Sequence, residues 1–222
     1  MSIHNIIFSK ISFWISRSRL LARFIFGIDF CSIGPEDYYF DVTTIVLYKY
    51  VSKKIDKTVK VLDLGTGAMA TIGISLWKKT GCNVLSIDIN DKLVELAMKN
   101  VKLNNAPIDV VQAKFIDFID DKFSVVVFNP PYVSIDTGKR RKLSDLRRTQ
   151  WDGGKEGIDI ITELFEEIQM QGRALILYIG MNHLHVKRDK MINCVNSFAD
   201  IKINKIYRSP LLPVDVYCIK SF

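Results

Sequence analysis

Short apolar runs alternate with amphipathic stretches along most of this chain. Runs rich in Val, Ile and Leu predict strands, and apolar residues at helical spacing between them predict helices. The expected strands are residues 59–64, 83–89, 108–112, 123–128, 173–179, 201–208 and 214–221. The expected helices are residues 37–51, a segment ending near Lys79, 91–104, 158–170 and 184–198. This alternation predicts an α/β fold with a doubly wound, mostly parallel sheet.

The first fifty residues differ from this pattern. Large apolar residues in residues 3–28 recur at roughly helical spacing among Ser, Arg and Lys, and a break follows at Gly27. We therefore expect an N-terminal helical extension at 1–50 and one main domain at 51–222. The extension could pack on the main domain, bind a partner or lie on a membrane surface, and the sequence leaves these alternatives open.

Composition narrows the class of protein. The chain has 222 residues, of which 48% are hydrophobic, so it can bury a substantial core. Its four cysteines are scattered and show no metal-ligand spacing, which favours free thiols, a cytoplasmic location and no metal site. No apolar run is long enough to predict a membrane span.

The net charge of +7 is concentrated in two places. Residues 1–30 carry +3 and residues 139–148 carry +5, while the remainder is close to neutral. Two local basic patches indicate a negatively charged or bulky partner, so we expect a macromolecular substrate.

The most informative motif follows the strand predicted at 123–128. It reads Asn129-Pro130-Pro131-Tyr132, and it stands at the carboxyl end of a strand, where ligands bind in open α/β sheets. Two prolines predict a rigid turn rich in carbonyls, and Asn129 adds a side-chain carbonyl. Two such acceptors can bind both hydrogens of a planar –NH2 group, and Tyr132 offers a face for a flat amide or base.

A second motif ends the strand at 59–64. It reads Asp63-Leu64-Gly65-Thr66-Gly67, and Asp88 ends the next strand, 23 residues beyond Gly65. Glycines allow a tight turn close to a ligand, and a carboxylate at Asp88 can accept both ribose hydroxyls of an adenosine-containing cofactor. This half of the site alone fits NAD, FAD or S-adenosylmethionine (SAM). Asp63 suits a cofactor with a cationic amino-acid end.

Together the two motifs resemble the class I SAM-dependent amino-methyltransferases of the Asn-Pro-Pro-Tyr type. The segment Trp151-Asp152-Gly153-Gly154-Lys155-Glu156-Gly157 is similar to the glycine segment of the release-factor glutamine methyltransferases, the HemK group, and Pro35-Glu36-Asp37 faintly resembles the segment that precedes their core. The resemblance covers roughly residues 34–180 and implies a seven-stranded Rossmann-like methyltransferase sheet and SAM as cofactor.

The resemblance also implies roles for individual residues. Catalysis falls to Asn129, Pro130 and Tyr132, and substrate binding to Pro131, Tyr132, Trp151, Gly153 and Gly154. Cofactor binding falls to Asp63, Gly65, Thr66, Gly67, Asp88, Ile89, Phe115 and Asn129. The family has Gly-Asp after its third strand, where the acid contacts the adenine amino group, whereas this chain has Ala113-Lys114. Adenine recognition could therefore fall to the backbone or to Phe115.

Three functions remain open from the sequence. A protein glutamine side chain is the first expected methyl acceptor, because of the glycine segment. The second is an adenine of RNA or DNA, because an expected loop at 139–148 borders the expected substrate entrance and carries six basic residues that could contact phosphate: Lys139, Arg140, Arg141, Lys142, Arg147 and Arg148. The third is a non-catalytic SAM-fold subunit. His183 and His185 are interpreted as surface residues without a role.

Overall fold

The computed structural model of this chain describes residues 15–32, 39–114, 123–144 and 148–222. Its strands are β1 (Lys60–Leu64), β2 (Asn83–Asp88), β3 (Asp109–Gln112), β4 (Val125–Phe128), β5 (Ile176–Asn182), β6 (Ile201–Arg208) and β7 (Val214–Ser221). Its helices are α2 (Arg19–Phe26), α3 (Val42–Val51), α4 (Thr71–Thr80), α5 (Asp91–Leu103), α6 (Ile135–Arg140), α7 (Arg148–Trp151), α8 (Asp159–Gln171) and α9 (Arg188–Asn196).

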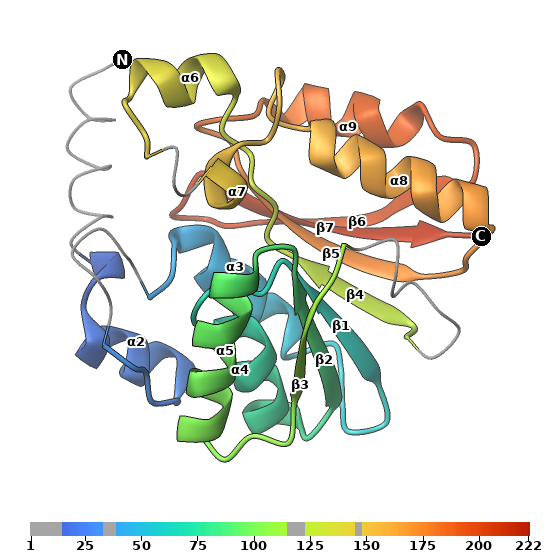
Figure 1. Cartoon of the computed structure of the whole chain (residues 1–222). Coiled ribbons are helices and arrows are strands. Elements are labelled where there is room, and N and C mark those ends of the chain that lie inside the picture. The colour runs from blue at the N-terminus through green and yellow to red at the C-terminus, as the bar shows by residue number, and fades with distance from the viewer. Residues whose placement is uncertain (1–14, 33–38, 115–122, 145–147) are drawn as a thin grey trace.

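The strands form one seven-stranded sheet in the order β3-β2-β1-β4-β5-β7-β6 (Figure 1). Pairing is parallel from β3 through β5, and β7 runs antiparallel to both β5 and β6. The strand order reverses between β1 and β4, which is the position where open α/β sheets bind ligands. The predicted doubly wound, mostly parallel α/β fold is confirmed.

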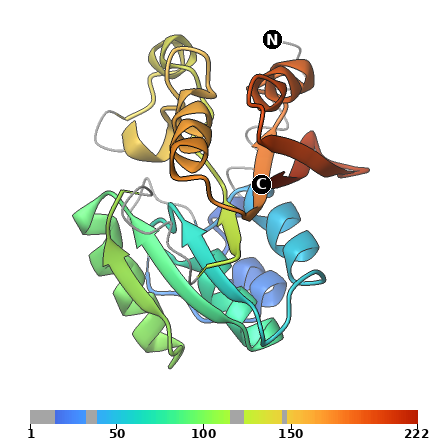
Figure 2. The ribbon, with the colours of Figure 1, turned by 90° about the vertical axis from the view of Figure 1, so that its right-hand side faces the viewer.

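Helices cover both faces of the sheet, as the two views show (Figures 1 and 2). Successive residues of β4 alternate between the layers: Val125 and Val127 pack with α2, α3, α4 and α5, whereas Val126 and Phe128 pack with α8 and α9. Strands buried on both faces read as continuous apolar runs, which explains why the central strands were visible in the sequence.

The helix α3 is part of the core. Leu47 is fully buried, and a Cβ added at Gly180 of β5 would meet Thr43 and Leu47 of this helix. Phe26 of α2 packs its ring against Phe40 and Tyr48 at centroid distances of 5.4 Å. The described part of the expected extension therefore packs on the main domain. The predicted domain boundary at residue 50 stays a prediction, and residues 1–14 and Pro35-Glu36-Asp37 lie outside the described residues.

Two expectations about local structure were wrong. The loop expected at 139–148 is helical at its two ends, because Lys139 and Arg140 belong to α6 and Arg148 begins α7. Residues 141–144 lie outside helices and strands, and 145–147 lie outside the described residues. The two histidines are not surface residues: the side chain of His183 is 6% exposed and bonded to Asp215, and His185 is half-buried. Short charged helices carry no apolar periodicity, and a buried histidine has no sequence signature of its own.

Candidate active site

The carboxyl ends of β1, β2 and β4 lie side by side. Leu64 pairs in register with Phe128 on one side and with Ile87 on the other. The glycine turn that follows Leu64, the aspartate that follows Ile87 and the Asn-Pro-Pro-Tyr motif that follows Phe128 are therefore brought to one edge of the sheet. This is the arrangement that the two sequence motifs predicted.

The glycine turn has the backbone conformation that its sequence requires. Gly65 and Gly67 have φ angles of 64° and 65°, in the left-handed region that favours glycine. Thr66 N donates to Ile87 O at 2.9 Å, which ties the turn to β2. A Cβ added at Gly67 would meet no atom within 4 Å, so this part of the turn faces open space. Together these features fit close approach of a ligand to the backbone.

The helix that follows the turn begins without a side-chain cap. Its N-cap residue is Ala70, with a φ of 47° that is uncommon for a residue other than glycine. Ala70 thus offers no side-chain acceptor to the first turn of α4, and the helix dipole favours negative charge at this end. Strained backbone beside a glycine turn is typical of a functional site.

Asp63 is buried beneath this turn. Its Oδ2 accepts hydrogen bonds from Thr66 Oγ1 at 2.6 Å, Gly73 N at 3.1 Å and Ser86 Oγ at 3.1 Å. Burial raises the pKa of Asp63 to about 6, and these three donors offset the effect only in part. Asp63 therefore shapes the turn through one carboxylate oxygen. Its predicted contact with the cofactor's cationic end stays a prediction.

Asp88 connects the turn to the helix α5. Its Oδ2 accepts from Gly67 N at 2.9 Å and its Oδ1 from Asn90 N at 3.0 Å. Burial raises the pKa of this carboxyl, and the backbone donors act in the opposite direction. The next residue, Ile89, is 55% exposed although it is large and apolar. An acceptor followed by an exposed apolar side chain fits a ribose and the flat ring attached to it.

Asn129 has one end of its amide bonded and the other unpaired. Its Nδ2 donates to Asp41 Oδ1 and to Thr44 Oγ1, each at 3.1 Å. Its Oδ1 is buried without a hydrogen-bond partner. Because a carboxylate accepts hydrogen bonds and cannot donate them, Asp41 fixes which way the amide points. A buried, unpaired carbonyl at the end of β4, next to the strand that leads into the glycine turn, is a ready acceptor for a ligand N–H.

Tyr132 is held by the same carboxylate. Its hydroxyl donates to Asp41 Oδ2 at 2.8 Å and lies 3.0 Å from Thr43 Oγ1. Its ring packs against that of His185, with centroids 5.5 Å apart. Asp41 also caps α3, accepting from Thr44 N at 2.7 Å. Sequence reasoning missed Asp41, although an Asp three residues before Thr44 is a recognisable N-cap pattern.

The glycine segment, residues 151–157, packs against the backbone of the Asn-Pro-Pro-Tyr motif. A Cβ added at Gly153 would lie 2.7 Å from Pro131 O, and one at Gly157 would lie 2.7 Å from Tyr132 O. Gly154 has a φ of 86° and no room for a side chain beside Asp159. Gly153 and Gly157 are therefore required for backbone-to-backbone packing on the motif, and Gly154 for packing against Asp159. The predicted contact of Gly153 and Gly154 with substrate stays a prediction.

Trp151 joins the two short helices. Its indole Nε1 donates to Ser144 O at 3.0 Å, and its ring fills the space above Gly138 of α6. Basic residues are exposed along this pair of helices: Lys139, Arg140, Arg141, Lys142 and Arg148. The charge of Arg141 reaches His185, whose pKa it helps to lower. Arg147 lies outside the described residues, and the predicted roles of Trp151 and the basic residues stay predictions.

Lys114 stands where the family resemblance implies an acid. Its Nζ is ion-paired with Glu163 Oε1 of α8. A carboxylate therefore lies near the end of β3, but it comes from Glu163 of α8. Phe115, the other residue expected to contact adenine, lies outside the described residues.

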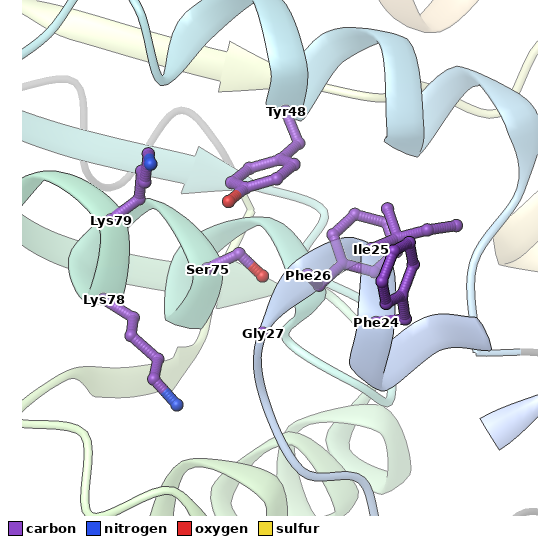
Figure 3. Close-up of a pocket in the computed structure, with 8 residues that line it drawn as sticks. All are labelled: Phe24, Ile25, Phe26, Gly27, Tyr48, Ser75, Lys78 and Lys79. Atoms are coloured by element: carbon purple, nitrogen blue, oxygen red, sulfur yellow. The ribbon is translucent and has the colours of Figure 1, made fainter. Parts of the chain in front are cut away.

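A pocket of about 240 Å³ lies between α2, α3 and α4 (Figure 3). Phe24 of α2 and Tyr48 of α3 line it together with Lys78 and Lys79, which lie in the last turn of α4. Since the glycine turn is at the start of α4, this pocket does not belong to the predicted site. In the described ranges no group of His, Cys, Asp and Glu is arranged to hold a metal ion, and no helix could span a membrane.

Comparison with known proteins gives the family. The model of the methyltransferase small domain matches residues 37–144. The chain is 33% identical to the "Putative protein N5-glutamine methyltransferase" of Methanocaldococcus jannaschii over 136 residues, which cover 61% of this chain and 66% of that protein. This chain belongs to the SAM-dependent methyltransferases. Its predicted resemblance to the Asn-Pro-Pro-Tyr amino-methyltransferases is confirmed, and so is SAM as cofactor.

Two further similarities complete the picture of this methyltransferase. It is 38% identical over 80 residues to the "Release factor glutamine methyltransferase" of Lactococcus lactis, which cover 36% of this chain and 29% of that protein. It matches the crystal structure of a methyltransferase from Pyrococcus furiosus with a TM-score of 0.68 at 16% identity, covering 96% and 97% of the two chains. The chain thus spans two thirds or less of these curated relatives, and the structural match supports the fold.

Proposed function

We propose that this methyltransferase transfers the methyl group of SAM to the side-chain amide nitrogen of a glutamine in a protein. The observation that carries the proposal is the buried, unpaired Oδ1 of Asn129. That atom follows β4, whose end pairs in register with the end of β1, so it stands beside the glycine turn expected to hold the cofactor.

The residues present fit SAM. The glycine turn would approach the methionine part, with Asp63 beneath it, while Asp88 would accept the ribose hydroxyls and Ile89 would pack on the adenine ring. When bound there, SAM supplies a methyl group on a positively charged sulfur, which is open to attack by a nitrogen lone pair. The assignment rests on the open space at Gly67, on the left-handed backbone of Ala70 at the start of α4 and on the exposure of Ile89.

Asn129 Oδ1 and the carbonyl of Pro130 would accept the two hydrogens of the substrate –NH2 group. This grip would aim the nitrogen lone pair at the methyl carbon and stabilise the positive charge that grows on nitrogen as the new C–N bond forms. Formation of the C–N bond would break the carbon–sulfur bond and leave its electron pair on sulfur, and the substrate nitrogen would then lose its proton to water. No general base is required.

A protein glutamine is favoured over other planar nitrogens by two relatives named for glutamine methylation. The support within this chain is the glycine segment, whose Gly153 and Gly157 pack directly on Pro131 and Tyr132. An RNA adenine is the second candidate. The observation that favours it is the run of exposed basic residues on α6 and after it, which includes Arg141 near the site.

The experiment that separates these candidates uses radiolabelled SAM. The enzyme is incubated with purified release factor, with total RNA and with both, and each product is then treated with protease or nuclease. We expect label in the release factor that protease releases and nuclease leaves intact, and mass spectrometry should place one methyl group on a glutamine. Label that only nuclease releases would show that RNA, and not the release factor, is the substrate. Absence of label in both the release factor and the RNA would contradict both candidates.

A further inference from the structure

Two buried side-chain atoms in the described ranges lack a hydrogen-bond partner, and both flank Tyr132. One is Asn129 Oδ1 and the other is His185 Nδ1. The connection is direct, because Asn129 and Tyr132 share Asp41 and the ring of His185 packs on that of Tyr132 at 5.5 Å. Most buried polar atoms in folded proteins are hydrogen-bonded, so two unpaired atoms linked through Asp41 and Tyr132 fit a ligand with two polar groups.

His185 is held in place by structure around the motif. Its backbone N–H donates to the backbone carbonyl of Asn182 at 3.1 Å, in the turn that follows β5. The neighbouring Val186 packs against the glycine segment, since a Cβ added at Gly157 would lie 3.1 Å from Val186 Cγ2. The backbone of His185 is thus placed next to a residue that packs on the glycine segment, and its ring packs against Tyr132.

The ring of His185 is neutral. Burial lowers its pKa to about 4, with a further lowering by Arg141 and a smaller opposite effect of Asp41. A neutral imidazole has one N–H donor and one acceptor, and the surroundings select which nitrogen carries the hydrogen. His185 can therefore donate one hydrogen bond from its ring at neutral pH.

We propose that His185 binds the methyl-accepting amide by donating a hydrogen bond from Nδ1–H to the amide oxygen. The inference rests on the proposed function and deepens it. Asn129 Oδ1 would accept from the –NH2 group, which leaves the oxygen of the same planar amide in need of a donor. His185 then selects substrates in which an acceptor stands next to the reacting nitrogen, and it disfavours an amine such as lysine, which lacks one.

Three substitutions test this assignment. His185→Leu removes both ring nitrogens, His185→Asn keeps a donor near the position of Nδ1, and His185→Gln places its amide near Nε2. Leu184→Ala serves as the matched control, because Leu184 is the exposed neighbour in the same turn. Each variant is assayed for methyl transfer to purified release factor and for SAM affinity by calorimetry, and its thermal unfolding is compared with that of the wild type.

We expect His185→Leu to lower kcat/KM for the release factor by roughly 10- to 100-fold with SAM affinity unchanged, because the substrate oxygen would be buried without a donor. His185→Asn should recover more activity than His185→Gln, and Leu184→Ala should match the wild type. Wild-type kcat/KM in a folded His185→Leu enzyme would overturn the inference while leaving the proposed function intact. Equal activity of the Asn and Gln variants would overturn the assignment to Nδ1, and label found only in RNA would overturn both proposals.

Discussion

Asp41 accepts a hydrogen bond from Asn129 at 3.1 Å, although the two residues are 88 positions apart in the chain. The carboxylate stands at the start of α3, and the amide stands at the end of β4. A negative charge behind Nδ2 polarises the amide and increases the negative partial charge on Oδ1, the atom left for a ligand. The first helix of the core thus orients and strengthens the acceptor that the proposed chemistry needs.

Asp41→Ala should therefore lower kcat by roughly 10- to 100-fold while leaving SAM affinity within about twofold, the scale expected for a group that orients a transition-state contact. It should also cost about 1 kcal/mol of stability through the lost helix cap. Rapid-quench transfer assays and calorimetry measure the two effects separately.

Asp41→Asn is the matched control, because Asn caps helices as well as Asp does and still offers an acceptor to Asn129. It should retain the stability of the wild type and lose less activity than Asp41→Ala. Full activity in Asp41→Ala would mean that Asn129 needs no support from α3.

Asp88→Ala should weaken SAM binding by roughly 10- to 100-fold, since it removes the expected ribose acceptor and the partner of Gly67 N, each worth about 1–2 kcal/mol. Asp88→Asn keeps one acceptor and should bind with intermediate affinity. Titration calorimetry with SAM gives both values. Equal affinity in all three proteins would show that the ribose is held elsewhere.

Stability should fall as the pH rises from about 4 to 6, through the contribution of Asp63. Its pKa is raised from 3.8 to about 6 in the folded protein, so across this interval the folded state binds more protons than the unfolded state. Stability then decreases with pH. A shift of this size corresponds to about 3 kcal/mol.

The substitution Asp63→Asn isolates this contribution, because it keeps an acceptor for the three donors and removes the charge. Denaturant unfolding at pH 4.5 and pH 7.5 should show the variant gaining stability relative to the wild type as the pH rises. A difference in unfolding free energy between the two proteins that does not change with pH would contradict a raised pKa for Asp63 in the folded state.

Gly73→Ala should destabilise the protein by about 1–3 kcal/mol, the usual cost of overpacking a tightly packed position. The added Cβ would lie 2.5 Å from Ser86 Oγ and 2.9 Å from Asp63 Oδ2, within the network that shapes the glycine turn. Gly172→Ala is the comparison, since no atom lies within 4 Å of its added Cβ and only its φ of 59° opposes the change. Thermal unfolding should show a larger decrease for Gly73→Ala, together with weaker SAM binding that Gly172→Ala does not share.

The sequence predicted the sheet well because buried parallel strands read as unbroken apolar runs, and three of these runs end in the residues that form the site. The antiparallel pairing of β7 with β6 could also be predicted from the sequence. Only five residues separate β6 from β7, which is too short for the crossover that parallel strands require. What the sequence could not show were the contacts made across long separations, because no local pattern links Asp41 to Asn129 or His185 to Tyr132.

The most direct test of the central claim is a single-turnover assay of Asn129→Ala with SAM and release factor. The account predicts a transfer rate lower by roughly 10²- to 10³-fold, the usual effect of removing one preorganised polar group, with SAM affinity nearly unchanged. An unchanged transfer rate would contradict the role of Asn129 as the acceptor that grips the methylated nitrogen.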